Sequence, residues 1–193
     1  MAAQPTARLS PEEYLAFERT ATTRHEYYHG NLFAMAGASY AHAVIISRLT
    51  RHLGNGLASQ NCDVLSNDLR VRVSSAGLYT YPDLVIVCGQ PQFADDQKDT
   101  LLNPKVLVEV LSPSTEAHDR GFKFAEFRKI ESLQEYVLVS QQEARVEIFY
   151  RREAGQWLLT EFVGLDAQCR FDSLQCSLPL ADIYAGLDLI PAP

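Results

Sequence analysis

The sequence has few of the residues that mark small secreted and zinc-binding proteins. Its 193 residues include only four cysteines, Cys62, Cys88, Cys169 and Cys176. No two of them form a CxxC pair, and no histidine stands at zinc-finger spacing. We therefore expect neither a zinc site nor a disulfide framework. Cys88 ends an apolar run, where a cysteine behaves as a small buried hydrophobe.

The sequence also lacks long apolar runs. No stretch is long enough to cross a bilayer, and residues 1–5 lack the basic and apolar regions of a secretory signal. We therefore expect a cytoplasmic protein without a membrane partner.

Basic residues are outnumbered, with 17 Lys and Arg against 24 Asp and Glu, which gives a net charge of −7. Because phosphate binding depends on basic patches, this balance argues against strong non-specific DNA binding by the free protein. A local patch is still compatible with the sequence. Its candidates lie on one predicted strand and in one predicted helix: Arg70, Arg72, Arg120, Lys123, Arg128 and Lys129.

Helical and strand patterns alternate along the chain, as is typical of one α/β or α+β domain with a mixed sheet over residues 1–193. The predicted core elements are a helix at 39–53, a half-buried strand at 64–73, two central strands at 82–88 and 105–111, a helix at 119–132 and a central strand at 135–139. A short helix from Ser10, a hairpin at 25–35 and an antiparallel pair at 145–151 and 157–162 extend this core.

Two acidic residues interrupt the two central apolar runs. Asp83 follows Pro82 at the start of the first run, and Glu109 stands inside Val106–Leu111. A buried carboxylate is costly unless something pairs with it. Asp83 alone is compatible with a solvated strand end, and Glu109 with a buried salt bridge. Because the two acids can lie side by side if their strands pair, the pattern favours a divalent-metal site.

Other polar residues could complete such a site. Lys123 follows Asp119 by four positions on the predicted helix, and the pair is compatible with either a weak surface ion pair or a functional lysine. Asp68 is a weaker third acid on a polar strand face. His42, at the start of the first long helix, is compatible with a capping, core or site histidine.

This set of residues suits phosphodiester hydrolysis. Asp83 and Glu109 supply hard oxygen ligands for Mg²⁺ or Mn²⁺, and the Val110 carbonyl is a candidate third ligand. A bound metal lowers the pKa of water and polarises a phosphoryl group. Lys123 could help to deprotonate that water or stabilise the developing charge.

The residues resemble the PD-(D/E)XK nuclease superfamily and, more closely, the Uma-two family of restriction-endonuclease-like proteins. The resemblance extends over nearly the whole chain. Its matching stretches are His25–Tyr27 with Gly30, Met35–Ser39 with His42, Asp68, Tyr81–Val85, Val108–Thr115, Asp119 with Lys123, and Ser132–Val139.

The resemblance implies a restriction-endonuclease-like αβββαβ core at about residues 39–140, metal-binding acids at Asp83 and Glu109, and a homodimer. The chain departs from the pattern at two positions. Leu111 occupies the superfamily's lysine position, so the lysine is expected at Lys123 on the helix. Phe127 stands where the family tends to carry a tyrosine, which removes a hydroxyl.

Two functions from different classes are therefore compatible with the sequence. One is a Mg²⁺-dependent DNA endonuclease, which the retained Asp83, Glu109 and Lys123 favour. The other is a nuclease-derived protein that no longer cuts and acts as a dimeric binding or regulatory protein, which the acidic charge favours.

Overall fold

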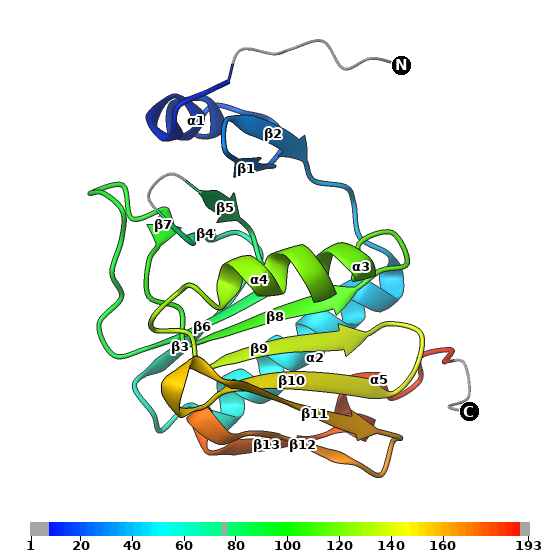
Figure 1. Cartoon of the computed structure of the whole chain (residues 1–193). Coiled ribbons are helices and arrows are strands. Elements are labelled where there is room, and N and C mark those ends of the chain that lie inside the picture. The colour runs from blue at the N-terminus through cyan, green and yellow to red at the C-terminus, as the bar shows by residue number, and fades with distance from the viewer. Residues whose placement is uncertain (1–7, 75–76, 190–193) are drawn as a thin grey trace.

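The computed structural model describes residues 8–74 and 77–189, and its central feature is a six-stranded mixed sheet (Figure 1). In spatial order the strands are β11 (Trp157–Val163), β10 (Arg145–Arg151), β9 (Glu135–Ser140), β8 (Val106–Leu111), β6 (Leu84–Cys88) and β3 (Cys62–Ser66). Only the β8–β9 pair is parallel. The order α2, β3, β6, β8, helix, β9 confirms the predicted αβββαβ core with extra terminal strands.

Helix α2 (Tyr40–Gly56) covers one face of this sheet. Its side chains Ile45, Leu49 and Leu53 repeat at four-residue spacing and pack in one apolar cluster with alternate residues of β8. Ser39 caps the helix, because its hydroxyl accepts a hydrogen bond from the His42 N–H. The predicted helix is confirmed and runs three residues further than expected.

A composite helix covers the opposite face, as Figure 1 shows. It consists of α3 (Glu116–His118), the π-helical segment η1 (Asp119–Lys123) and α4 (Phe124–Phe127). The predicted helix at 119–132 is therefore shorter and less regular than expected. The Asp119 carbonyl accepts the N–H of Phe124, five residues on, and also the hydroxyl of Tyr136 at 3.1 Å. Such π segments are rare and frequently lie at functional sites.

A second sheet and a short helix lie above the composite helix in Figure 1. In spatial order the strands are β2 (Asn31–Ala34), β1 (His25–Tyr28), β5 (Leu78–Thr80), β4 (Arg70–Arg72) and β7 (Thr100–Leu101), and the helix is α1 (Pro11–Glu18). The continuous strand predicted at 64–73 is wrong, because it is divided between β3 and β4 in different sheets. The chain turns at Asp68, whose N–H donates to the Ser66 carbonyl at 2.6 Å.

The C-terminal region adds a small hairpin and short helices. They are β12 (Gln168–Phe171), β13 (Cys176–Pro179), α5 (Leu180–Tyr184) and the 3₁₀ turns η2 (Glu153–Gly155) and η3 (Asp172–Leu174). Within residues 8–74 and 77–189, no helix is long and apolar enough to cross a membrane.

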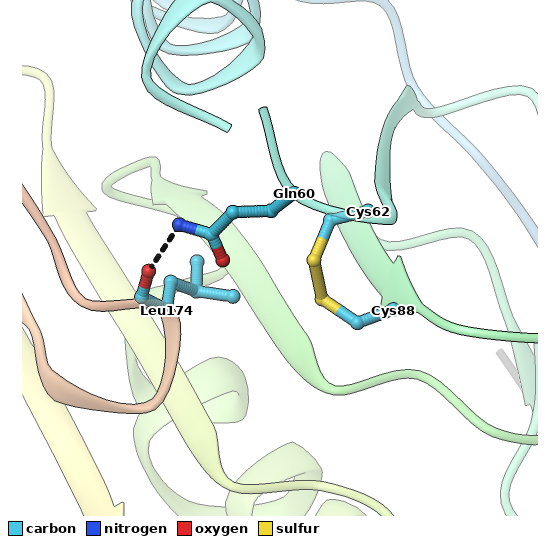
Figure 2. The surroundings of a disulfide bond; sticks show 4 residues. All are labelled: Gln60, Cys62, Cys88 and Leu174. Carbon is cyan, nitrogen blue, oxygen red and sulfur yellow. Dashed lines mark hydrogen bonds between the residues drawn. A yellow bond between two sulfur atoms is a disulfide. The ribbon is translucent and has the colours of Figure 1, made fainter. Parts of the chain in front are cut away.

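The sequence predicted no disulfide framework and a free, buried Cys88. The prediction for Cys88 is wrong, because Cys62 and Cys88 are bonded to each other (Figure 2). The antiparallel register of β3 and β6 places these two residues directly opposite one another, which their distance in sequence conceals. Beside this bond, the Gln60 side chain donates to the Leu174 carbonyl at 2.9 Å, as Figure 2 also shows. This end of the sheet is therefore tied by a covalent bond and by a link to the C-terminal region.

Candidate active site

The pairing of β6 with β8 brings the two predicted acids together. The register places Leu84 opposite Val108, so Asp83, just before β6, lies beside Glu109. The Asp83 N–H is 3.4 Å from Oε2 of Glu109, and Oδ2 of Asp83 accepts the Val110 N–H at 2.7 Å. Glu109 is only 4% exposed. It lies on the β8 face covered by the composite helix, since its alternation partners Leu107 and Leu111 pack there.

Lys123 lies within the same cluster. Its Nζ is 2.9 Å from Oε1 of Glu109, 3.4 Å from Oδ1 of Asp119 and 3.3 Å from Oε1 of Glu26. The lysine side chain is about one-tenth exposed. Lys123 and Asp119 occupy the two ends of the π-helical segment, and both are buried. The i, i+4 pair anticipated from the sequence therefore exists, but inside the molecule and with two further acids.

The surplus of acids over cations sets the protonation of the cluster. Burial lowers the pKa of Lys123, but the carboxylates of Glu109, Glu26 and Asp119 outweigh it and raise that pKa above its usual value. Burial raises the pKa of Glu109 well above its usual range, and nearby Asp83 and Asp119 raise it further, against the opposing effect of Lys123. The ammonium is therefore held protonated, while the acids compete for protons or another cation.

The other predicted residues have different outcomes. His42 lies at the site, with its Nε2 3.1 Å from Oδ2 of Asp83 and its buried Nδ1 without a hydrogen-bond partner within the described parts of the chain. Asp119 also joins the cluster through Lys123. Asp68 does not, because its exposed side chain pairs with Arg24. The expectation that Asp68 is an accessory site residue finds no support in this geometry.

Two residues at this site have no role predicted from the sequence, Glu26 and Tyr136. Glu26, from β1, contacts Lys123 and accepts a hydrogen bond from the Thr80 hydroxyl. Tyr136, from β9, is fully buried and donates to the Asp119 carbonyl. Phe127 packs edge-on against the Tyr136 ring at 5.2 Å. Tyr136 therefore places a hydroxyl beside the composite helix, where Phe127 has no hydroxyl to offer.

The donor set suits a hard divalent cation that keeps much of its water. Asp83 and Glu109 offer carboxylate oxygens on neighbouring strands, and Mg²⁺ is usually bound by one or two carboxylates and several waters. Across residues 8–74 and 77–189, no group of three or more His, Cys, Asp or Glu side chains is arranged to hold a metal. The two carboxylates of Asp83 and Glu109 therefore fit a hard divalent cation that keeps several waters.

Most of the cations that could have formed a local basic patch are paired with carboxylates. Arg70 is buried and pairs with Asp99 at 3.0 Å. Arg120 pairs with Glu116 and Glu147, and Lys129 pairs with Glu126. These cations are largely neutralised by neighbouring carboxylates, so they provide little attraction for a phosphate backbone.

Comparisons with known proteins agree with one another. Residues 11–181 match the sequence model of the Uma2 family, described as "Putative restriction endonuclease". Two relatives from Synechocystis sp. (strain ATCC 27184 / PCC 6803 / Kazusa) are named uncharacterized proteins slr1290 and sll1609. The first is 37% identical, with 95% of each chain covered, and the second is 33% identical, covering 91% of this chain and 99% of the relative.

A solved structure from Anabaena variabilis ATCC 29413, described as a "putative nuclease belonging to DUF820", has the same fold. Its TM-score is 0.76 at 17% identity, and the match covers 93% of this chain and 99% of that one. The family and the fold together support a nuclease.

Proposed function

The chain belongs to the Uma2 family, and we propose that it is a DNA endonuclease that depends on Mg²⁺ or Mn²⁺ and hydrolyses phosphodiester bonds. The observation that carries this proposal is the convergence of Asp83, Glu109 and Lys123, with Lys123 2.9 Å from Glu109. Burying a cluster with more acids than cations on two paired central strands lowers the stability of the fold. Stability alone therefore does not explain the cluster.

Each residue has a distinct role in this proposal. Asp83 and Glu109 would hold the metal, and the Val110 carbonyl would be the third protein ligand. When bound, the metal supplies a water of lowered pKa and polarises the phosphoryl group. The protonated Lys123 stabilises negative charge on the phosphate as it develops. Its raised pKa favours this role over proton abstraction.

Three further residues position these groups. His42 contacts the Asp83 carboxylate and fixes its orientation. Asp119 and Glu26 both contact the Lys123 ammonium and hold it beside Glu109. Tyr136 in turn fixes the backbone of Asp119. These contacts restrict the rotamers of Asp83 and Lys123, which is what a preorganised site requires.

The closed ion-pair network also favours the second candidate, a nuclease-derived binding or regulatory protein that does not cut. Asp83 is engaged by His42 and the Val110 N–H, and Lys123 by three acids. Under either function we expect DNA as the partner, a homodimer as the assembly and the cytoplasm as the location.

A cleavage assay tests the endonuclease. Supercoiled and linear DNA are incubated with the wild type, with Asp83→Asn and with Asp68→Asn, in Mg²⁺, in Mn²⁺ and in a chelator. We expect metal-dependent cleavage by the wild type and Asp68→Asn, whose exposed acid lies outside the cluster, and a loss of at least roughly 100-fold in Asp83→Asn. The proposal would be contradicted if Asp83→Asn cleaved DNA as the wild type does, or if the wild type cleaved DNA in neither Mg²⁺ nor Mn²⁺.

A further inference from the structure

A cavity of about 320 Å³ lies between the β1–β2 hairpin and the composite helix. It adjoins the cluster that Lys123 forms with Glu26, Glu109 and Asp119. Its lining is largely apolar, with one carboxylate: Glu26, Tyr28, Phe33, Leu78, His118 and Phe122. This volume is at the lower end of the range for small-ligand sites, about 300–1,000 Å³. The cavity therefore suits one compact ligand or one residue of a longer ligand.

Aromatic rings from two parts of the chain form its walls. Tyr28 meets Phe122 edge-on, with ring centroids 4.7 Å apart, and His118 stacks on Phe122 at 4.8 Å. Phe33 on β2 also lines the cavity, and its side chain is 54% exposed. Flat aromatic walls with an exposed ring are the usual means of holding a planar base by stacking.

The cavity shares a wall with the candidate active site. Glu26 lines the cavity, and its Oε1 is 3.3 Å from Lys123 Nζ. Phe122 and Lys123 are consecutive in the π-helical segment, and the first lines the cavity while the second faces Glu109. A group bound in the cavity therefore lies directly beside the proposed site of cleavage.

We propose that this cavity binds one unpaired nucleobase of the DNA substrate, next to the phosphodiester that is cut. The inference rests on the proposed function, since it takes DNA as the ligand. The base stacks on the exposed ring of Phe33, against the wall formed by Tyr28, His118 and Phe122, and the Glu26 carboxylate accepts a hydrogen bond from an amino or imino group on its edge. In the described parts of the chain, the Thr80 and Lys123 contacts of Glu26 both fall on Oε1, which leaves Oε2 for the base.

The consequence is a substrate class. A base inside a continuous duplex has both faces covered by its neighbours, so it enters such a cavity only after unstacking, at a cost of a few kcal/mol. A bulge, a mismatch or a single strand avoids most of this cost. The enzyme therefore acts preferentially where a base is already unpaired, and a base-stacking contact compensates for the protein's net negative charge.

Binding is measured by fluorescence anisotropy in Ca²⁺, with the DNA checked for integrity on a gel. The probes are a duplex with a one-nucleotide bulge and the matching perfect duplex. The proteins are the wild type, Phe33→Ala, Phe33→Tyr and Phe17→Ala. Phe17 is a matched control, because it is 42% exposed on α1 and does not line the cavity.

We expect the wild type, Phe33→Tyr and Phe17→Ala to bind the bulged duplex roughly tenfold more tightly than the perfect one, and Phe33→Ala to lose this preference. Equal affinities for the two duplexes in the wild type, no binding to either, or a preference that Phe33→Ala retains would each overturn the inference.

The two proposals fail in different ways. If cleavage depends on Asp83 but is equal for bulged and perfect duplexes, the endonuclease proposal stands and the proposal that the cavity binds a nucleobase fails. If binding prefers the bulged duplex through Phe33 but no DNA is cut, the cavity proposal stands and the binding protein is favoured over the endonuclease.

Discussion

The two ends of the six-stranded sheet each bury a glutamate, and the two side chains have different surroundings. Glu109 on β8 lies toward the end that holds Asp83, with Lys123 2.9 Å away. Glu135 starts β9 at the opposite end of the sheet, the end that also carries the Cys62–Cys88 disulfide, and is 0% exposed. Its Oε1 accepts the Ser173 N–H at 2.6 Å, and its Oε2 has no hydrogen-bond partner in the described parts of the chain.

This difference separates a candidate functional acid from a structural one. Burial raises the pKa of Glu135 to about 7, with only the Ser173 hydrogen bond as a strong opposing effect. That carboxyl can simply keep its proton. Glu109 shares one ammonium with Glu26 and Asp119 and also lies beside Asp83, so the cluster has acids to spare for a divalent cation. Burial alone does not indicate a site, whereas an excess of acids around a buried lysine does.

The largest effect on stability is expected from Lys123→Met. This change leaves Glu109, Glu26 and Asp119 without their shared cation, and breaking a buried ion pair by removing one partner costs about 3–5 kcal/mol. We expect that loss in urea-induced unfolding above neutral pH. Lys129→Met is the control, because Lys129 is more than half exposed and its pair with Glu126 is worth at most about 1 kcal/mol. Equal losses in the two variants would show that the Lys123 cluster is energetically an ordinary surface network.

Reduction of the disulfide should have the next largest effect, at the other end of the sheet. The bond spans 26 residues, and opening it should lower the free energy of unfolding by about 3 kcal/mol through the entropy of the unfolded chain. The measurement is urea unfolding with and without dithiothreitol, alongside thiol titration. The Cys62→Ala/Cys88→Ala variant should not respond to dithiothreitol. DNA cleavage should survive reduction, since the bond lies away from Asp83 and Glu109. A reductant that abolished cleavage without unfolding the protein would contradict the separation of the two ends.

An effect that appears only as the pH rises, and that is smaller near neutral pH, is expected from Glu135→Gln. The pKa of Glu135 is about 7 in the folded state and 4.5 in the unfolded state. Between these two pH values the folded state therefore holds a proton that the unfolded state has released. This carboxyl therefore contributes its full stability below about pH 4.5, and that stability is lost as the pH rises through 7. Glutamine keeps the acceptor for Ser173 without a charge. The variant should match the wild type near pH 4 and exceed it by up to about 3 kcal/mol at pH 8. Parallel stability curves over this range would contradict the account of Glu135.

Much of the fold could be predicted from the sequence, because apolar periodicity is a local signal. The central strands, helix α2 and the hairpin all occur where the pattern placed them. The broken strand at 64–73 was missed because the Asn67–Asp68 turn interrupts an alternation that continues on both sides. The π segment was missed because one extra residue in a helical turn leaves the apolar periodicity almost unchanged, and its Asp119 carbonyl is contacted by Tyr136, which is distant in sequence.

The site shows the same division between local and non-local information. Asp83, Glu109 and Lys123 could be chosen because each is a charged residue in an apolar setting, and the structure brings them together. Glu26 gave no such signal, because β1 belongs to the second sheet and meets Lys123 only in the folded chain. The disulfide was missed for the same reason, since only the β3–β6 register reveals that Cys62 faces Cys88.

The central claim is that the Glu109 end of the sheet binds a divalent cation and the Glu135 end does not. Calorimetric titration with Mn²⁺ tests it most directly, with the same substitution made at two buried glutamates. We expect the wild type and Glu135→Gln to bind Mn²⁺ alike, and Glu109→Gln to bind it at least roughly tenfold more weakly, because a carboxylate ligand has been removed. Equal Mn²⁺ affinities in all three proteins would contradict the claim and leave Glu109 as a structural partner of Lys123.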